Sequence, residues 1–265
     1  MGEADDVELL AEIAREAGAL AMTFFQQNPK SWAKGETSIV SEADLEVDNL
    51  LSARLLAARP DYGWLSEETA DDPARLDCHR VFVVDPIDGT RGFLSGSREW
   101  TISLAIVEKG RPVAAVLFAP ALDAMFQAVE GMGARRDGGS LRVSHRTELA
   151  GASLAGSRRL VRETLEIASI ETEYHGNIPS LAYQFALVAA GEVDVAIARR
   201  GAYDWDLAAA DLLVHEAGGR LADLDGKRPR YNALDRRHPV LLASTPALCD
   251  EMAAIVATAE LRRLG

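Results

Sequence analysis

A short apolar segment, residues 81–84, is rich in β-branched side chains and ends abruptly in Asp85-Pro86-Ile87-Asp88-Gly89-Thr90. A run of this kind predicts a buried strand, and this one would deliver Asp85 to its C-terminal end. Ligands of open α/β sheets bind at that end of the strands. The segment therefore points to a layered α/β protein with a polar site at the edge of a sheet.

Helix and strand patterns alternate along the rest of the chain, which has no repeat and no clear linker. We therefore expect one continuous structural unit of mixed α/β class, with an N-terminal α+β lobe over residues 1–150 and a C-terminal α/β lobe over residues 151–265. Apolar spacing predicts helices over residues 6–26, 43–58, 180–190 and 206–217 and from Pro246 onward. Strands are expected over residues 101–107 and 113–118 as a hairpin, and over residues 125–129, 141–144, 193–198, 220–223 and 240–243.

The chain is strongly acidic, with a formal net charge of −13 at pH 7. A nucleic-acid binder usually presents a basic surface, so this charge argues against a nucleic-acid polymer as partner. Bound divalent cations would reverse the negative field that an anionic phosphate substrate meets, so an acidic enzyme and a metal requirement fit together. The alternative is that most of these charges only keep the protein soluble.

No stretch approaches the ~18 apolar residues that a membrane-spanning helix needs. The acidic start of the chain lacks the basic region of a signal peptide. We therefore expect a soluble, cytoplasmic protein with no membrane partner. The two cysteines, Cys78 and Cys249, have no paired spacing, and the histidines form no metal-binding motif, so disulfide and zinc chemistry have little support.

The acidic turn that follows the predicted strand has the donors of a metal site. Asp85 and Asp88 are close enough in sequence for a tight turn to aim both carboxylates and the Ile87 carbonyl at one point. Such oxygen ligands suit Mg²⁺, which is bound by carboxylates, water and substrate phosphate. Gly89 permits a close approach of the backbone, and the N–H groups of Gly89 and Thr90 would face an anion if they opened a helix. The alternative is a loop of turn residues without a ligand.

Two other acidic segments add candidate ligands. Glu67 and Glu68 follow an apolar patch that would form a short strand entering the same site, although adjacent acids are also common on solvated surfaces. Asp204 and Asp206 flank Trp205 at the start of an Ala-rich helix. Either carboxylate could cap that helix, which would leave the other free for a metal ion.

Taken in order, these segments resemble the inositol monophosphatase superfamily. Members of that family carry a Glu-Glu pair, then Asp-Pro-[Ile/Leu]-Asp-Gly-Thr after a strand, and then Trp-Asp-x-Ala-Ala with a downstream Glu-Ala-Gly-Gly. The resemblance spans nearly the whole chain. The matching segments are Ser41-Glu42-Ala43-Asp44, Glu67-Glu68, Asp85-Pro86-Ile87-Asp88-Gly89-Thr90, Trp205-Asp206-Leu207-Ala208-Ala209 and Glu216-Ala217-Gly218-Gly219.

The resemblance implies a layered αβαβα sandwich of the inositol monophosphatase and fructose-1,6-bisphosphatase type, with most metal ligands in the N-terminal lobe. It implies a Mg²⁺-dependent, lithium-sensitive phosphomonoesterase, with Mn²⁺ as an alternative ion, that forms a homodimer. By position, Glu67, Asp85 and the Ile87 carbonyl would hold a first ion. Asp85, Asp88 and Asp206 would hold a second, and a weaker third ion would depend on Glu67 and water.

The catalytic set that the resemblance implies is Asp44, Glu67 and Thr90. Asp44 and Thr90 match the family pair that orients and deprotonates the attacking water. Because the metal ions clamp the attacking and departing oxygens, no protein nucleophile is needed. Lys34 begins Lys34-Gly35-Glu36-Thr37-Ser38, which matches a mobile lid of the family, and it would steady the phosphate or the third ion. The alternative for Lys34 is an ordinary surface lysine.

The resemblance implies a small phosphate ester as the substrate, and two features favour a nucleotide bisphosphate. Arg91 and Gly92 follow Thr90 where inositol monophosphatases have x-Asn, and the basic residue is closer to the bacterial 3'(2'),5'-bisphosphate nucleotidases, although those have Glu where this chain has Gly92. Arg199 and Arg200 stand before Trp205 where inositol-specific members place a Glu, and two guanidiniums would grip a second phosphate. The alternative for these arginines is a solvated turn.

We therefore expect adenosine 3',5'-bisphosphate as the substrate, with AMP and phosphate as products. Inositol-1-phosphate is the main alternative, and histidinol phosphate and fructose-1,6-bisphosphate are hydrolysed by relatives with this fold. An alternative of another class is a regulatory binding module that has lost turnover. Such a module should have lost metal ligands, whereas this chain keeps all the matching acids.

Overall fold

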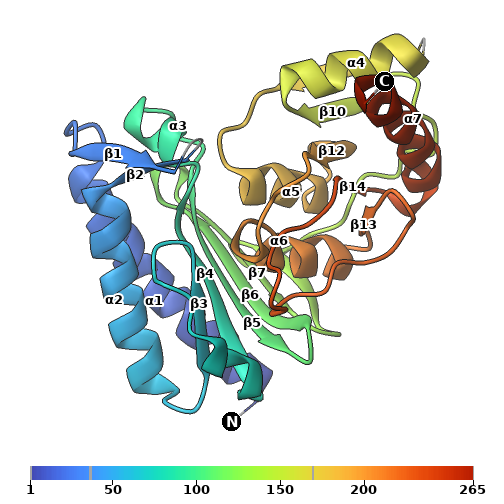
Figure 1. The fold of residues 1–265 in the computed structure, drawn as a ribbon. Helices are drawn as coiled ribbons and strands as arrows, with labels where there is room; N and C mark the ends of the chain where they lie inside the picture. The colour runs from blue at the N-terminus through green and yellow to red at the C-terminus, as the bar shows by residue number, and fades with distance from the viewer. Residues whose placement is uncertain (1, 36–37, 169, 265) are drawn as a thin grey trace.

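The computed structural model describes residues 2–35, 38–168 and 170–264, which form five stacked layers in the order αβαβα (Figure 1). Helices α1 and α2 cover one face of a seven-stranded sheet, and α5 and α6 lie between that sheet and a five-stranded sheet. Helices α4 and α7 cover the outer face of the five-stranded sheet. The expected layered sandwich is confirmed. The helices are α1 (Glu3–Phe24), α2 (Glu42–Ala58), α4 (Arg158–Ala168), α5 (Leu181–Ala189), α6 (Asp204–Glu216) and α7 (Pro246–Leu264).

The seven-stranded sheet has the strand order β3-β4-β5-β6-β7-β8-β9, with β3 parallel to β4 and the other neighbours antiparallel. β4 is buried from residue 81 to residue 88 because α2 covers one of its faces and α6 the other. A strand covered on both faces reads as a continuous apolar run, which is the pattern at residues 81–84. The strands are β3 (Gly63–Ser66), β4 (Arg80–Asp88), β5 (Thr101–Glu108), β6 (Arg111–Ala119), β7 (Ala124–Val129), β8 (Gly133–Arg136) and β9 (Gly139–Ser140).

The five-stranded sheet has the strand order β11-β10-β12-β14-β13. β10 runs parallel to β11 and β12, whereas β14 runs antiparallel to β12 and β13. Its strands are β10 (Ser153–Gly156), β11 (Glu173–Gly176), β12 (Val195–Ala198), β13 (Arg220–Asp223) and β14 (Leu241–Ser244). The remaining elements are the hairpin of β1 (Ser31–Lys34) and β2 (Ser38–Ser41), the short helix α3 (Thr90–Leu94), and the 3₁₀ helices η1 (Pro73–Asp77) and η2 (Pro120–Leu122).

The predicted strand over residues 141–144 is wrong, because the chain leaves the sheet after β9. The N–H of Leu141 donates to the Ala134 carbonyl over 2.8 Å, and the N–H of Val143 donates to the Ala217 carbonyl, 3.1 Å away in the turn after α6. One of these bonds goes to β8 and the other to the turn after α6, so the segment pairs with no single strand. The apolar side chains of this segment therefore mark a packed connection and not a strand.

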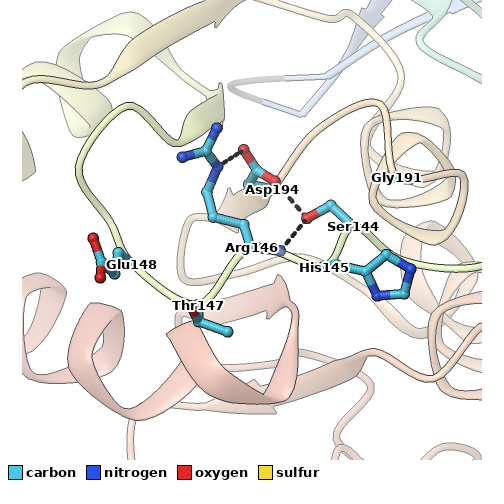
Figure 2. Close-up of a pocket in the computed structure, with 7 residues that line it drawn as sticks. All are labelled: Ser144, His145, Arg146, Thr147, Glu148, Gly191 and Asp194. Atoms are coloured by element: carbon cyan, nitrogen blue, oxygen red, sulfur yellow. Dashed lines mark hydrogen bonds and ion pairs between the residues drawn. The ribbon is translucent and has the colours of Figure 1, made fainter.

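The buried carboxylate of Asp194 holds the segment between β9 and β10, which connects the two sheets (Figure 2). Its two oxygens accept from the Ser144 hydroxyl (2.5 Å) and from the Ser153 N–H (2.8 Å), and it forms an ion pair with Arg146 at 3.0 Å. The sheets thus divide along the chain on either side of this connection. A division into two lobes at residue 150 stays a prediction.

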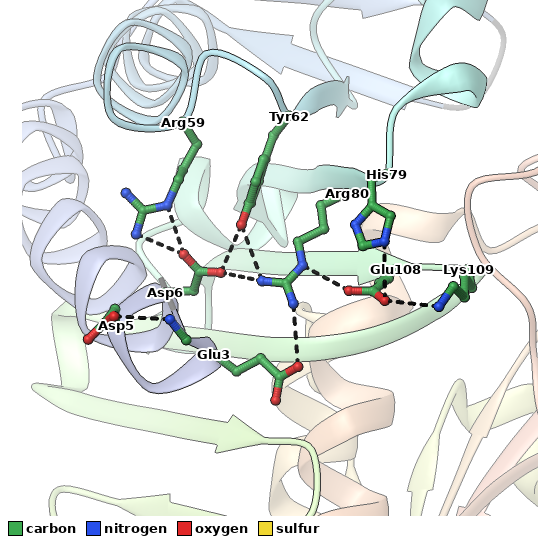
Figure 3. Close-up of polar contacts among 10 residues, drawn as sticks. Glu3, Asp5, Asp6, Arg59, Tyr62, His79, Arg80, Glu108 and Lys109 are labelled. Atoms are coloured by element: carbon green, nitrogen blue, oxygen red, sulfur yellow. Dashed lines mark hydrogen bonds and ion pairs between the residues drawn. The ribbon is translucent and has the colours of Figure 1, made fainter.

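A second buried carboxylate, Asp6, ties the start of α1 to α2 and to β4 (Figure 3). Its oxygens accept from Arg59 (2.9 Å), from Arg80 (2.8 Å) and from the Tyr62 hydroxyl (3.0 Å). Arg80 also donates to Glu108 on β5 over 2.9 Å. Each buried charge of this network therefore has a charged or hydrogen-bonding partner, as burial requires.

Across the described ranges 2–35, 38–168 and 170–264, every helix is too short or too polar to cross a lipid bilayer.

Candidate active site

β4 carries two carboxylates into the interior at its C-terminal end. Asp85 and Asp88 are both buried, and the pairing of β4 with β5 shifts register between them. A bulge of this kind turns side chains away from the regular alternation of a strand. Oδ1 of Asp85 accepts a hydrogen bond from the Ile87 N–H over 3.0 Å, which closes the turn. The acidic hexapeptide thus ends a buried strand, as predicted.

Gly89 lets the chain turn from β4 into α3. Its φ of 94° lies in the left-handed region, where residues with a side chain are strained. A Cβ atom at this position would also lie 3.0 Å from the backbone N of Ser180 and 3.2 Å from the carbonyl carbon of Pro179. Gly89 is therefore required both by its backbone angle and by the neighbouring chain. That the N–H groups of Gly89 and Thr90 bind phosphate stays a prediction.

The start of α5 holds the carboxylate of Asp88. Oδ2 accepts from the Ser180 hydroxyl (2.5 Å) and from the Ala182 N–H (2.7 Å), and Oδ1 accepts from the Leu181 N–H over 3.3 Å. Burial raises the pKa of Asp88 to about 6, and these hydrogen bonds oppose the rise because they favour the ionised form. Neither Ser180 nor this contact was predicted, although a Ser before a helix is a recognisable cap signal.

Asp206 comes to the same place from α6, in the other half of the chain. Asp85, Asp88 and Asp206 each offer a carboxylate oxygen, and these three atoms lie within 4.8 Å of one another. Burial and mutual repulsion raise the pKa of both Asp85 and Asp206 well above the ordinary value of an aspartate. We refer to Asp85, Asp88 and Asp206 as the carboxylate cluster.

The two acids around Trp205 have separate partners. Asp204 is buried, and its oxygens lie 2.7 Å from Nε2 of His238 and 2.7 Å from the Asn232 N–H that donates to it. Asp206 accepts from the Tyr203 N–H over 2.7 Å, which caps α6, and still belongs to the carboxylate cluster. Asp204 therefore anchors a loop, and Asp206 is the acid left for a ligand.

Glu67 lies next to the carboxylate cluster without belonging to it. It follows β3, and its N–H donates to the Val84 carbonyl on β4 over 3.2 Å. Burial and the neighbouring charge of Glu68 raise the pKa of Glu67 to about 7. The charge of Glu67 in turn raises the pKa of Asp85, so the two carboxylates interact.

Asp44 and Thr90 are in direct contact. The Thr90 Oγ atom lies 2.9 Å from Oδ1 of Asp44 and 3.1 Å from the Ile87 carbonyl oxygen. Oδ2 of Asp44 accepts from both the N–H (2.8 Å) and the hydroxyl (2.5 Å) of Ser41 at the start of α2. Burial raises the pKa of Asp44 above its usual range. The structure thus brings together the expected water-activating pair, whose catalytic role stays a prediction.

Lys34 on β1 forms hydrogen bonds with Glu67 and Glu68. Its Nζ donates to the Glu67 carbonyl oxygen over 2.5 Å and to Oε2 of Glu68 over 2.8 Å. The lid segment expected after Lys34 includes Glu36 and Thr37, which lie outside the described residues. A role for Lys34 in holding phosphate or a third ion stays a prediction.

Arg199 and Arg200 are exposed at the end of β12. Nε of Arg199 donates to the Ser157 hydroxyl over 2.9 Å, just before α4. Arg200 lines a cavity together with Asp223 and Asp225. None of these contacts involves the carboxylate cluster, so the role of the two arginines in substrate binding stays a prediction.

The donor set suits a small hard cation. Asp85 and Asp88 are buried and Asp206 is half-buried, and their carboxylates lie at one place. Burial raises the pKa of all three, and repulsion by neighbouring carboxylates adds to the rise at Asp85 and Asp206, so a bound cation would favour their ionised forms. Divalent cations such as Mg²⁺ and Mn²⁺ bind oxygen ligands of this type. With Glu67, Asp44 and Thr90 beside it, the cluster can hold a metal ion next to a group that can take up a proton.

The geometry agrees with the comparison to known proteins. The model of the inositol monophosphatase family matches residues 4–261. The chain belongs to the inositol monophosphatase family. As a member of that family it is a phosphoric monoester hydrolase. The family is metal-dependent, and the carboxylate cluster is an acidic group that could hold a metal ion.

Relatives in this family carry more than one name. The chain is 34% identical to an inositol-1-monophosphatase of Mesorhizobium japonicum, covering 83% of this chain and 86% of that one. It is 31% identical to a 3'(2'),5'-bisphosphate nucleotidase of Aggregatibacter actinomycetemcomitans, covering 83% and 85%. The IMPase of Thermotoga maritima has a similar structure, with a TM-score of 0.86, 28% identity, and coverage of 98% of this chain and 100% of that one.

Proposed function

We propose that this phosphatase requires Mg²⁺ and transfers the phosphoryl group of a small metabolite directly to water. The observation that carries the proposal is the carboxylate cluster, in which ligands from β4 and α6 lie within 4.8 Å of one another. Asp85, Asp88 and Asp206 would hold one ion, and Glu67, Asp85 and the Ile87 carbonyl another, with a weaker third beside Glu67. Mn²⁺ would substitute for Mg²⁺, and Li⁺ would inhibit.

The chain's own groups would handle the proton of the attacking water. Asp44 is buried and accepts a hydrogen bond from the Thr90 hydroxyl. A water that donates a hydrogen bond to Thr90 can therefore pass its proton toward Asp44. The two hydrogen bonds from Ser41 keep Asp44 oriented for this task. When bound, the metal ions neutralise phosphoryl oxygens and make water a better nucleophile at neutral pH.

For the substrate we propose adenosine 3',5'-bisphosphate. Arg199 and Arg200 stand where inositol-specific relatives have a Glu, and exposed guanidiniums are suited to a second phosphate. Inositol-1-phosphate is the second candidate, favoured by the 34% identity to an inositol-1-monophosphatase. A homodimer is the expected assembly. The presence of every matching acid argues for turnover and against a purely regulatory module.

The deciding experiment compares kcat/KM for adenosine 3',5'-bisphosphate and inositol-1-phosphate at saturating Mg²⁺, without Mg²⁺, and with added Li⁺. Phosphate release that depends on Mg²⁺, falls with Li⁺ and is faster with the bisphosphate is the expected result. Asp206→Asn should abolish turnover of both esters. No release from a broad panel of phosphate esters would instead favour a binding module.

The arginines are tested on the same two substrates. Arg199→Ala or Arg200→Ala should raise KM for the bisphosphate about tenfold or more, the effect of one lost charged phosphate contact, and leave KM for inositol-1-phosphate nearly unchanged. Arg162→Ala is the matched control, because Arg162 is exposed and pairs with Glu166 on α4. Equal effects on both substrates would remove the preference for a nucleotide.

A further inference from the structure

Asp88 is held from the opposite half of the chain by the first turn of α5. Of its two oxygens, Oδ2 receives two short hydrogen bonds, from the Ser180 hydroxyl at 2.5 Å and the Ala182 N–H at 2.7 Å. Oδ1 receives one long bond of 3.3 Å from the Leu181 N–H. Oδ1 is therefore the oxygen with more free capacity for a further partner.

The hydroxyl of Ser180 uses its full hydrogen-bonding capacity at this position. A serine hydroxyl donates one hydrogen bond and accepts two. The Tyr183 N–H donates to it over 2.9 Å, which caps α5, and Asp88 as a carboxylate only accepts. The single proton of Ser180 is thus committed to Asp88, and the Thr101 hydroxyl, 3.1 Å away, must be the donor of the third bond.

These hydroxyls have no exposure to solvent, since Ser180 and Thr101 are both 0% exposed. Water therefore does not compete for the Ser180 proton, and the hydrogen-bond direction is set by the protein alone. Thr101 is also the residue that faces Asp88 across the β4–β5 ladder. The arrangement holds Asp88 from its own sheet and from α5 at once.

Packing keeps the start of α5 close to the acidic turn. A Cβ atom at residue 89 would come within 3.0 Å of the backbone N of Ser180 and within 3.2 Å of the carbonyl carbon of Pro179. The ring of Pro179 fills the space beside Gly92, where a Cβ atom would meet it at 2.5 Å. Two glycines thus let α5 approach closely enough for Ser180 to reach Asp88.

We propose that Ser180 is a positioning residue for the metal site: its hydroxyl occupies Oδ2 of Asp88 and thereby directs Oδ1 toward the cation. Ser180 does not touch the reacting atoms, and its effect passes through Asp88. The proposal rests on the proposed function, because it requires the carboxylate cluster to bind a divalent ion. Residues that orient metal ligands typically change metal affinity about 10- to 100-fold when they are removed.

The test measures binding of Mn²⁺ alone to the full-length protein by calorimetry and by the paramagnetic resonance of free Mn²⁺. Ser180→Ala should bind Mn²⁺ about tenfold or more weakly than the wild type. Ser180→Thr, which keeps a hydroxyl, should restore affinity. Ser244→Ala is the matched control, because Ser244, at the end of β14, is equally buried and its hydroxyl donates to the backbone carbonyl of Thr245.

Measurements of stability and of kinetics distinguish the proposed metal-positioning role of Ser180 from a role in helix capping alone. The loss of a cap or of another buried hydrogen bond costs about 1 kcal/mol, so Ser180→Ala and Ser244→Ala should both lower Tm, whereas only Ser180→Ala should weaken Mn²⁺ binding. Ser180→Ala should also raise the Mg²⁺ concentration for half-maximal rate while leaving the substrate KM at saturating Mg²⁺ unchanged. If Ser180→Ala does not fold, the nearly isosteric Ser180→Cys, a weak donor, replaces it with the same expected result.

The outcomes distinguish this inference from the proposed function. Wild-type affinity for Mn²⁺ in a folded Ser180→Ala or Ser180→Cys variant would overturn the positioning role. An equal loss of affinity in Ser244→Ala would overturn it too, because the effect would then follow from general destabilisation. Absence of Mn²⁺ binding by the wild-type protein would instead contradict the metal site itself.

Discussion

The hydroxyl of Thr90 lies 2.9 Å from Oδ1 of Asp44, although the two residues belong to different helices, α3 and α2. Asp44 is anchored by Ser41, and the single proton of the Thr90 hydroxyl is shared between Asp44 and the Ile87 carbonyl oxygen, 3.1 Å away. The pair is therefore arranged before any substrate arrives. A prearranged acceptor and hydroxyl is what general base catalysis of water attack needs.

We predict that Thr90→Val lowers kcat by about 10²- to 10⁴-fold, the usual range for losing a general acid–base contribution. Mn²⁺ binding should stay at the wild-type level, because the carboxylate cluster is untouched. Thr90→Ser, which keeps the hydroxyl, should retain most of the activity. Steady-state kinetics with a parallel Mn²⁺ titration provides the measurement, and a fully active Thr90→Val variant would exclude the Asp44–Thr90 pair from proton transfer.

The raised pKa of Glu67, about 7, predicts a metal affinity that depends on pH. Below pH 7 the Glu67 carboxyl is protonated and cannot serve as an anionic ligand, so Mg²⁺ affinity should fall as pH drops from 8 to 6. A carboxyl whose pKa is higher in the folded state stabilises that state at low pH, and this contribution is lost as pH rises through 7. Because the ordinary pKa of this carboxyl is 4.5, the metal-free protein should thus lose stability as pH rises from about 4.5 to about 7.

Thermal unfolding with and without Mg²⁺ between pH 5 and pH 8 measures both effects. The increase in Tm on adding Mg²⁺ should grow with pH, because ligand binding to the folded state adds stability in proportion to its affinity. Glu67→Gln should flatten this dependence. A Mg²⁺-induced increase in Tm that is constant over the whole range would contradict the assignment of Glu67 as a ligand.

This chain has Gly92 where the related sequences have Asn or Glu. The ring of Pro179 accounts for the glycine, because it leaves no space for a side chain at residue 92. A Cβ atom at residue 92 would lie 2.5 Å from Cβ and 2.7 Å from Cγ of Pro179. We predict that Gly92→Asn destabilises the protein by about 1–3 kcal/mol, the usual cost of overpacking. Pro179→Gly should recover part of this loss in the double variant, because it removes both clashing atoms.

Urea unfolding of the two single variants and the double variant measures this coupling. Gly139→Asn is the control, because a Cβ atom there would meet its nearest neighbour, the Arg136 carbonyl oxygen, at 3.4 Å. Strictly additive losses at Gly92 and Pro179 would contradict a direct steric contact.

The network around Asp6 predicts a stability effect far from the active site. Asp6→Ala would leave Arg59 and Arg80 without their shared buried partner, which costs about 3–5 kcal/mol for a broken buried ion pair. Glu8→Ala, an exposed change on the same helix, should alter stability by less than about 0.5 kcal/mol. Urea unfolding measures both, and a loss below about 1 kcal/mol for Asp6→Ala would show that the network contributes little.

Much of the fold could be predicted because the sequence patterns are local. The continuous apolar run of residues 81–84 predicts a strand that proves to be buried on both faces as part of β4. The helical spacing over residues 180–190 agrees with α5, which begins one residue later, after the Ser180 cap. Residues 141–144 have the same apolar character as a strand, but their hydrogen bonds go to β8 and to the turn after α6, which no local pattern specifies.

The candidate site also combines residues that local patterns could assign with contacts that depend on distant parts of the chain. Asp85 and Asp88 could be assigned together because a tight turn follows from their spacing, and Asp206 because it begins a helix. Which of Asp204 and Asp206 remains available depends on His238 and Asn232, partners contributed by a distant loop. The contact of Ser180 with Asp88 is also long-range, so only the cap role of Ser180 could be inferred from its position before a helix.

The distribution of the carboxylate cluster along the chain has a consequence for synthesis. Asp85 and Asp88 leave the ribosome early, whereas Asp206 belongs to a helix made near the end of translation. A growing chain that has folded its large sheet alone would hold two repelling acids with no third oxygen to complete a cation's shell. If Asp206 is a metal ligand, as proposed, the site is complete only after α6 has packed onto the large sheet, and a chain truncated before that helix should not hydrolyse phosphate esters.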